Sequence, residues 1–305
     1  MSKEFEYYCH PNLELHQIKM MELLKFFIET CDKYELDYWL DGGSLLGLAR
    51  HASLIPWDDD IDICIPISSY YKLLDILDEI GKKNSMYSLY YRSNGLVSWG
   101  EYLCLSNWYC EYKSGYIKPI RIDLIPVKEV AFVEHDIDKK LVEDVYEYVV
   151  AKIKPFKMED KIKALDNYNE YMKGCIINED DCLLIKGHGQ YSPIKEIEKK
   201  YVYPLIKKEF MGMNVKIPHN MDYYLKKSYG IKYMTLPKVK SRRPMSINAY
   251  YSDKLNDKVN KLIKFDYESN NLGFIRRNFK KYLFLLSVFG FRHVITSQFK
   301  RVFKI

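Results

Sequence analysis

The chain has 305 residues, 48% hydrophobic and 29% charged, which predicts a soluble globular protein and excludes a disordered chain or a small disulfide-rich one. It has 47 basic and 41 acidic residues, but eight of the basic ones lie in residues 274–305, where there is no acidic residue. The rest of the chain has a net charge of −2, which argues against a general nucleic-acid-binding surface.

The first part of the chain predicts alternating helices and strands. Spaced apolar residues predict an amphipathic helix over Leu13–Tyr34, and a short buried strand follows over Tyr38–Leu40. Ser44 is expected to cap a short helix over Leu45–Arg50. Acidic and apolar residues then alternate over Asp58–Ile65, which predicts a strand.

Further helices and strands follow, so the predicted class is α/β or α+β. Ser68 is expected to cap a second helix. Two or three strands are expected between Ser85 and Tyr112, and another over Lys118–Val127. Helical patterns cover Asp136–Met172 and Asp253–Phe265, with a mixed region between them.

The acidic run is the most informative part of the sequence. If the strand reaches back far enough, Asp58, Asp60 and Asp62 share one face, about 7 Å apart in succession, while Asp59 points away. Carboxylates this close raise one another's pKa, and a divalent cation such as Mg²⁺ relieves the repulsion. The alternative is a solvent-exposed acidic loop without a metal. A calcium loop of the EF-hand type is disfavoured because the glycine and distal glutamate are missing.

Asp123 is the second acidic position of interest. It is one carboxylate in the otherwise apolar run Ile122–Pro126, and a lone buried Asp is costly unless it is paired or bound to a metal. Taken alone it is a structural hydrogen-bond acceptor. Beside an Asp-x-Asp strand it becomes a candidate third metal ligand.

A glycine turn precedes the acidic strand. Gly42, Gly43 and Ser44 lie between a predicted strand and a predicted helix, where free N–H groups could bind a phosphate. The alternative is a plain turn with a helix cap. Arg50 and His51 at the end of that helix could reach a phosphate or interact with the helix dipole.

These motifs together resemble the signature of the LicD family of phosphotransferases, which the fukutin-related enzymes share. The resemblance covers Trp39–Gly47, Arg50–His51, Ile55–Ile63 and Ile122–Pro126. A looser similarity to the family's C-terminal half runs from Phe210 to Pro237.

The resemblance implies a fold and a reaction. The fold would be a nucleotidyltransferase-like mixed β-sheet flanked by helices, with a mainly helical C-terminal part. The reaction would move a phospho-alcohol, most often phosphocholine, from a CDP-activated donor such as CDP-choline to a hydroxyl of a cell-surface glycan. Teichoic acid, lipopolysaccharide and capsule are the acceptors the family implies, and some members move ribitol phosphate.

The resemblance also implies roles for individual residues. Asp60, Asp62 and Asp123 would hold Mg²⁺ or Mn²⁺ as a pair of ions, and Asp58 would be a further acidic residue at the site. Asp123 or Asp58 would be the general base. The residues expected to hold the nucleotide phosphates are Gly42, Gly43, Ser44 and Arg50.

We expect three parts in the chain: a nucleotidyltransferase-like catalytic core (1–130), a helical or mixed part that completes the site (131–272), and a basic amphipathic tail (273–305). In the tail, basic residues flank the apolar run Tyr282–Phe291, so residues 274–305 either lie on an anionic membrane surface or pack as a helix. Seven cysteines without a Cys-x-x-Cys pair predict reduced thiols. The expected location is the cytoplasm, including the inner membrane face.

Two rival functions remain. One is a DxD-type glycosyltransferase, in which two carboxylates also hold a metal and a nucleotide sugar. The other is a non-catalytic glycan- or membrane-binding module. Donor choice separates the first rival from a LicD-type transferase, and metal binding separates the second.

Overall fold

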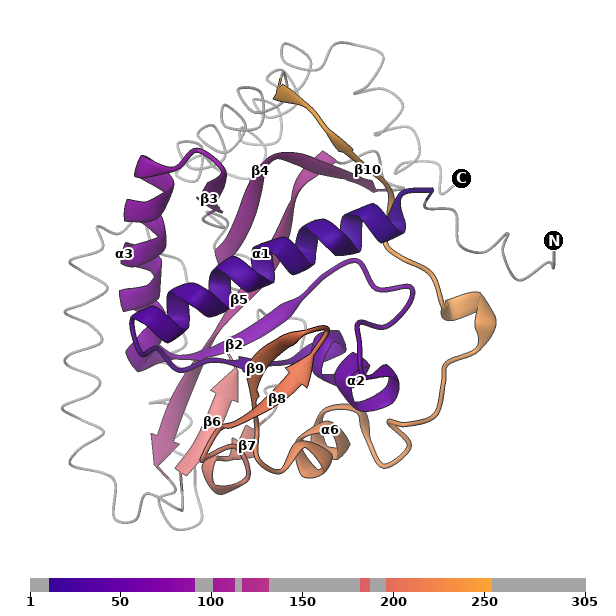
Figure 1. The fold of residues 1–305 in the computed structure, drawn as a ribbon. Coiled ribbons are helices and arrows are strands. Elements are labelled where there is room, and N and C mark those ends of the chain that lie inside the picture. Colours follow the sequence, from indigo (N-terminus) through magenta and orange to yellow (C-terminus); the bar gives the residue numbers. More distant parts are fainter. Residues whose placement is uncertain (1–10, 91–100, 113–116, 132–181, 187–195, 254–305) are drawn as a thin grey trace, which may run out of the picture.

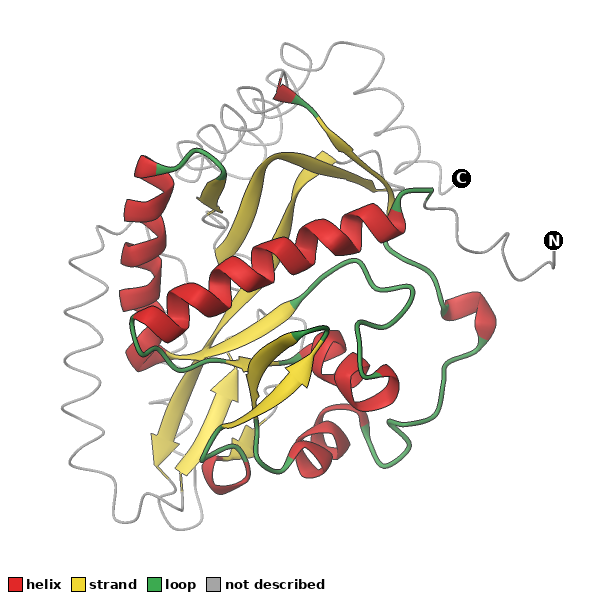
Figure 2. Cartoon of the chain, viewed as in Figure 1, coloured by secondary structure: helices red, strands yellow, loops and turns green. Residues whose placement is uncertain are grey.

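The structure is a computed structural model that describes residues 11–90, 101–112, 117–131, 182–186 and 196–253 (Figures 1 and 2). The helices expected over Asp136–Met172 and Asp253–Phe265 and the basic tail lie outside these residues, apart from Asp253 itself.

The described strands build one mixed eight-stranded sheet and one separate hairpin. The main path through the sheet runs in the order β1 (Trp39–Leu40), β2 (Asp62–Pro66), β5 (Ile117–Ala131), β4 (Glu101–Tyr112) and β10 (Ser246–Tyr251). The strands beside this path are β3 (Tyr87–Tyr90) on β4, β6 (Cys182–Lys186) on β5, and β7 (Glu196–Glu198) on β6. Only β2 and β5 pair in parallel among these strands. The prediction of a mixed sheet flanked by helices is confirmed.

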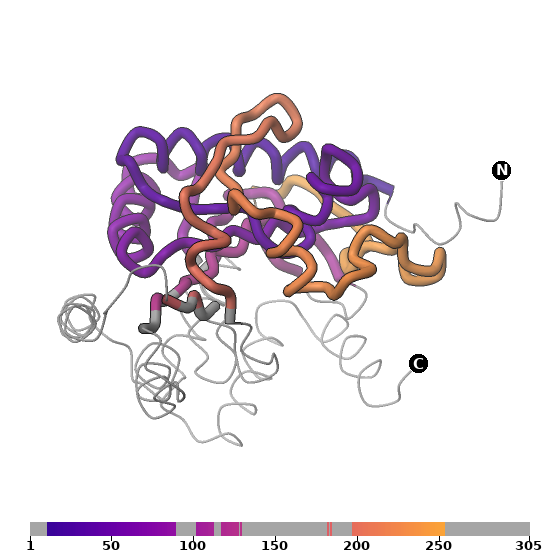
Figure 3. Tube along the Cα trace, turned by 90° about the horizontal axis from the view of Figure 1, so that it is seen from below, coloured from indigo at the N-terminus to yellow at the C-terminus, as the bar shows by residue number. Residues whose placement is uncertain are grey.

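Four α-helices accompany the sheet in the described part of the chain. They are α1 (Leu13–Lys33), α2 (Gly42–His51), α3 (Ile67–Lys83) and α6 (Met221–Tyr229). The short 3₁₀ helices are η3 (Lys199–Tyr201) and η4 (Val239–Ser241). The hairpin is β8 (Ile206–Phe210) with β9 (Met213–Ile217), and Lys207 on β8 donates to Asp32 at the end of α1, so the hairpin lies beside that helix (Figure 3).

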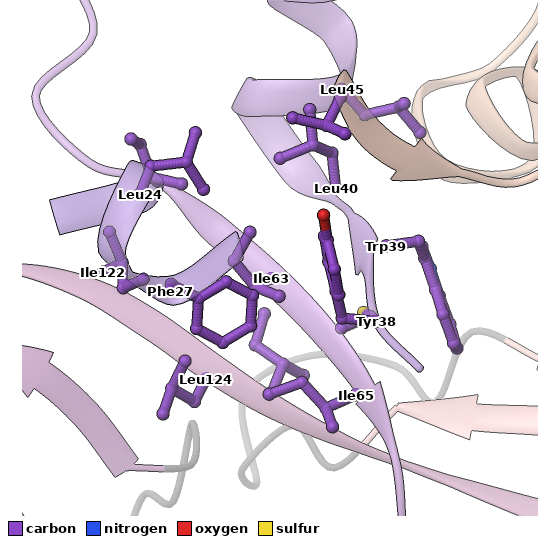
Figure 4. Close-up of a cluster of buried hydrophobic side chains, with 14 of the residues drawn as sticks. Leu24, Phe27, Tyr38, Trp39, Leu40, Leu45, Ile63, Ile65, Ile122 and Leu124 are labelled. Atoms are coloured by element: carbon purple, nitrogen blue, oxygen red, sulfur yellow. The ribbon is translucent and has the colours of Figure 1, made fainter. Parts of the chain in front are cut away.

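The core lies between α1 and one face of the sheet. Phe27 on α1 is fully buried among Ile63, Ile122 and Leu124, as Figure 4 shows. Side chains alternate along a strand, so the residues between these apolar ones point to the opposite face. The hydrophobic packing therefore orients Asp62 and Asp123 away from α1.

Several predicted boundaries were wrong. Helix α2, which was expected to start at Leu45, begins at Gly42 with Asp41 at the cap position, so Ser44 is not its cap. Gly42 has φ +52, which lets the chain turn from β1 straight into the helix. Likewise, α3 begins directly after Pro66 rather than at Ser68: Pro66 ends β2, stands at the cap position with ψ 142, and Ile67 is the first helical residue.

The strand predicted over Asp58–Ile65 is shorter than expected. The extended strand β2 begins at Asp62, and residues 58–61 form a loop that follows a turn, which the hydrogen bond from the Asp58 N–H to the Ile55 carbonyl closes. The run of acidic and apolar residues that predicted the strand therefore begins in the loop before β2.

The sheet takes strands from both sides of residue 131, because β6, β7 and β10 join strands from the first part of the chain. The division at 130 and 272 stays a prediction. No helix in the described ranges has the length and hydropathy needed to cross a membrane. Five cysteines of the described part are buried and form no disulfide: Cys31, Cys64, Cys104, Cys110 and Cys182.

Candidate active site

Two of the predicted acidic residues lie side by side on neighbouring parallel strands. Asp62, the first residue of β2, pairs in register with Asp123 of β5. The Asp123 N–H donates to the Ile61 carbonyl at 2.8 Å, which extends the ladder by one bond beyond Asp62. Paired residues in a sheet share a face, so both carboxylates lie on the face opposite α1.

The loop before β2 brings more carboxylates to this place. Ligand oxygens of Asp58, Asp59 and Asp60 lie within 4.8 Å of one another. Asp59 is buried, and its Oδ2 accepts the backbone N–H of Ser246 in β10, so it links the loop to the far strand of the sheet. Asp58 and Asp60 interact electrostatically with Asp62.

Burial and mutual repulsion favour protons on these acids in the metal-free protein. Burial, and next the charge of Asp123, raise the pKa of Asp60 to about 6. Burial raises the pKa of Asp62 well above its usual range, and the charges of Asp60 and Asp123 add to the effect. The pKa of Asp58 is raised in the same way by burial and by Asp60.

The cluster fits a hard divalent cation. Its donors are all carboxylate oxygens, and bringing them together is unfavourable unless a positive charge offsets the repulsion. The buried Oδ2 of Asp58 has no hydrogen-bond partner in the described ranges. Asp60 belongs both to the close group Asp58–Asp60 and to the predicted ligand set with Asp62 and Asp123.

The two glycines at the start of α2 lie directly against the acids. A Cβ atom at Gly42 would overlap Oδ2 of Asp62, and one at Gly43 would lie 2.5 Å from Oδ2 of Asp58. The helix N-terminus, with its partial positive charge, therefore meets the carboxylates without an intervening side chain. The structure thus gives both glycines a steric role, and their predicted phosphate contact stays a prediction.

Ser44 lies one residue further along α2 and is fully buried. Its hydroxyl oxygen accepts the backbone N–H of Asp62 at 3.1 Å. Ser44 therefore holds the first residue of β2, and with it the Asp62 carboxylate, against the helix.

Arg50 and His51 lie at the far end of α2. The guanidinium of Arg50 donates to the carbonyls of Tyr233 and Thr235, which ties the helix to the segment after α6. The ring of His51 packs edge-on against Trp57, with 6.1 Å between ring centroids. The predicted phosphate contact of Arg50 stays a prediction.

Sequence reasoning missed Arg121. Its Nε donates to Oδ1 of Asp123 at 3.1 Å, and its Nη1 donates to the Tyr112 hydroxyl at 2.9 Å. The guanidinium also lies over the Tyr102 ring, 4.6 Å from the centroid. Arg121 precedes Asp123 by two residues in the same strand, so the two-residue period of a strand is the signal that could have found it.

Sequence reasoning also missed a buried network that reaches the site from α6. The Tyr224 hydroxyl donates to Oδ1 of Asp41 at 2.8 Å and accepts from Nε1 of Trp39 at 3.0 Å. Asp41 is buried at the cap position of α2, and its backbone N–H donates to the Asp62 carbonyl. Tyr224 therefore anchors the residue from which α2 starts.

Tyr229, the last residue of α6, is a further aromatic residue near the acids. Burial of its hydroxyl raises its pKa, and the negative charges of Asp41 and Asp62 act in the same direction. Its side chain is nevertheless 46% exposed as a whole, so the ring lies at the edge of the site.

Known proteins resemble this part of the chain. Residues 35–158 match the family described as LicD/FKTN/FKRP, nucleotidyltransferase domain. The lipopolysaccharide cholinephosphotransferase LicD of Haemophilus influenzae is 38% identical over 64 residues, which cover 21% of this chain and 24% of that protein. The human ribitol 5-phosphate transferase FKRP is 44% identical over 46 residues, which cover 15% of this chain and 9% of that protein. Each of these matches spans less than a quarter of the relative's length.

Proposed function

We propose that this protein, whose residues 35–158 match the LicD/FKTN/FKRP nucleotidyltransferase domain, is a metal-dependent phosphotransferase that moves a phospho-alcohol from a CDP-activated donor to a glycan hydroxyl. The observation that carries the proposal is the pairing of Asp62 with Asp123, beside the carboxylates of Asp58 and Asp60. The names of the two relatives support the kind of group moved, since one transfers choline phosphate and the other ribitol 5-phosphate. Phosphocholine from CDP-choline is our first choice of donor group.

The cation would be Mg²⁺, or Mn²⁺ in its place, held as a pair of ions by Asp60, Asp62 and Asp123. When bound, it would supply positive charge to a diphosphate donor and to the nucleotide that leaves. Ser44 holds the main chain of Asp62 in place, and Arg121 holds Asp123, so both ligands are oriented by their neighbours.

Asp58 is our choice for the general base. Asp123 already accepts a hydrogen bond from Arg121, and a guanidinium partner lowers the proton affinity of a carboxylate. Oδ2 of Asp58 has no hydrogen-bond partner in the described part of the chain, so it is able to accept the proton of an attacking hydroxyl.

The N-terminus of α2 is our choice for the nucleotide phosphates. Gly42 and Gly43 bring the start of α2 directly against the Asp62 and Asp58 carboxylates, and free N–H groups at a helix start bind anions. Arg50 would act from the other end of the helix, either on a phosphate or by fixing the Tyr233–Thr235 carbonyls at the rim of the site.

The test is nucleotide release from a panel of donors. The full chain is incubated with Mg²⁺, a glycan acceptor, and either CDP-alcohols (CDP-choline, CDP-ribitol) or nucleotide sugars, and release of CMP or of a nucleoside diphosphate is measured. We expect CMP release that falls about a hundredfold or more in Asp60→Asn/Asp62→Asn and stays unchanged in Asp75→Asn, which changes an exposed residue of α3. Turnover of nucleotide sugars alone would favour a glycosyltransferase, and full activity in the double variant would refute the metal role of these acids.

A further inference from the structure

The segment after α6 carries an unusual share of exposed apolar side chains. We call residues 229–245 the rim segment. Five of the ten large apolar side chains that are exposed in the described part of the chain lie in it. Their exposed fractions are 46% for Tyr229, 83% for Ile231, 53% for Met234, 45% for Leu236 and 57% for Met245. Single exposed apolar residues are ordinary on a protein surface, but such a concentration marks an interaction site.

The rim segment is held firmly, so this exposure does not come from a loose loop. Tyr233 is buried, and its hydroxyl donates to Asp222 on α6 at 2.9 Å. The carbonyls of Tyr233 and Thr235 accept hydrogen bonds from Arg50. Arg242 donates to the Pro237 carbonyl at 2.8 Å, and its guanidinium lies 5.6 Å from the ring centroid of Trp57. The backbone is therefore fixed while the apolar side chains between these anchors point outward.

The charge of the rim segment has one sign. Its basic residues are Lys232, Lys238, Lys240, Arg242 and Arg243, and it contains no acidic residue. All of them except the partly buried Arg242 are exposed. Exposed apolar side chains among basic ones are the composition that binds an anionic lipid surface, where the apolar groups enter the interface and the cations meet the headgroups.

The position of the rim segment connects it to the candidate active site. It runs along the outer edge of the molecule between α6 and β10 (Figures 1 and 3). Arg50 lies on the same helix as Gly42 and Gly43, and Trp57 directly precedes Asp58. The segment is thus attached to both elements that carry the site.

We propose that the rim segment is a docking surface for an anionic membrane, which holds the active-site edge of the protein against the lipid headgroups. A glycan polyanion would use the lysines but would leave Ile231 and Met234 in water, so the lipid surface fits the whole segment better. The rim segment differs in sequence position from the basic tail of residues 274–305, and the proposal holds whether or not the donor and acceptor named above are correct.

The test is co-sedimentation of the full chain with vesicles. One set contains phosphatidylglycerol and phosphatidylcholine, and the other contains phosphatidylcholine alone. We expect the wild type to bind the anionic vesicles preferentially, and Ile231→Ser/Met234→Ser to lower the partition coefficient at least fivefold. The matched control is Met86→Ser/Met211→Ser, which changes two side chains that are 54% and 47% exposed elsewhere on the protein.

The variant Ile231→Ser/Met234→Ser should keep the wild-type melting temperature, because both replaced side chains are exposed. Unchanged vesicle binding by this variant would overturn the proposal, and the basic tail of residues 274–305 would then account for the binding. Absence of binding by the wild type would overturn it as well. A concentration-dependent dimer that the variant fails to form would show that the rim segment covers a second copy of the chain instead.

Discussion

Oδ2 of Asp62 occupies the place where Gly42 would carry a Cβ atom, and Oδ2 of Asp58 stands 2.5 Å from the corresponding place at Gly43. Two acids and two glycines thus form one packed unit, in which the start of α2 is shaped to admit carboxylates. This explains why α2 begins with two glycines, although glycine has a low helix propensity.

The unit predicts that Gly43→Ala lowers activity without unfolding the protein. Gly43 has no positive φ, and alanine favours a helix, so the free energy of unfolding should change by less than about 1 kcal/mol. The new methyl group would displace the Asp58 carboxylate, and we expect activity to fall about tenfold or more. Kinetics together with thermal unfolding measure both effects.

A double-mutant cycle with Asp58→Ala shows whether the glycine acts through that carboxylate. If it does, adding Gly43→Ala to Asp58→Ala costs little further activity. Two fully additive losses would mean that Gly43 acts on something else.

Tyr224→Phe should impair both stability and activity. It removes the hydrogen bond to Asp41 and the acceptor of the Trp39 indole, both buried, so unfolding should become easier by roughly 1–3 kcal/mol. The matched control is Tyr223→Phe, whose hydroxyl donates to Glu198 at 2.7 Å on the same helix but away from the acids. Denaturant unfolding and initial rates are measured for both variants, and we expect the larger losses in Tyr224→Phe. Equal effects of the two substitutions would contradict an anchoring role for Tyr224.

The metal-free protein should lose stability as the pH rises through the range where Asp60 titrates. Its pKa is about 6 in the folded protein against an ordinary value of 3.8, so the folded state binds the proton more tightly. The tighter proton binding of Asp60 therefore adds roughly 1–3 kcal/mol to the free energy of unfolding. This contribution is complete below about pH 4 and is lost as the pH rises past 6.

Asp60→Asn should remove the contribution of Asp60 to this pH dependence and make the metal-free protein more stable at pH 8, while the raised pKa values of Asp58 and Asp62 keep part of the dependence. Mg²⁺ should stabilise the wild type at that pH but not the variant. Thermal unfolding at pH 4 and 8, with EDTA or with Mg²⁺, measures the effect. A wild type whose melting temperature rises from pH 4 to 8 in EDTA would contradict this reading of the acid cluster.

Arg121→Met should move the acid limb of the activity profile to higher pH. Arg121 pairs with Asp123, and its charge lowers the pKa of Asp60, so its loss makes both acids hold their protons more tightly. The control is Lys199→Met, which breaks the ion pair with Glu129 further along β5. The profile of kcat/KM against pH should shift in the first variant only, and an unshifted limb in Arg121→Met would exclude the guanidinium from tuning the site.

The sheet and much of the acid cluster were accessible from the sequence because strand periodicity is local. Ile61, Ile63, Ile122 and Leu124 alternate with polar positions, and the apolar face that they predicted is the one buried under α1. Asp123 was singled out as the one carboxylate of an apolar run, and its role beside the acidic strand came from the resemblance to the LicD family.

Contacts between distant parts of the chain were not accessible in this way. Tyr224 lies 183 residues from Asp41, and no local pattern indicates that a buried tyrosine of a late helix reaches an early cap. The start of β2 was misplaced because acid alternation resembles a strand even in a loop. A strand ends where no neighbouring strand remains to accept or donate its backbone hydrogen bonds, and the sequence does not show where that neighbour ends.

The most direct test is titration of the full chain with Mn²⁺, with the free ion followed by electron paramagnetic resonance. The acid cluster predicts saturable binding in the wild type and in Asp75→Asn, and at least tenfold weaker binding in Asp60→Asn, in Asp62→Asn and in Asp123→Asn. Binding as tight as wild type in Asp60→Asn/Asp62→Asn would show that these carboxylates do not hold the metal.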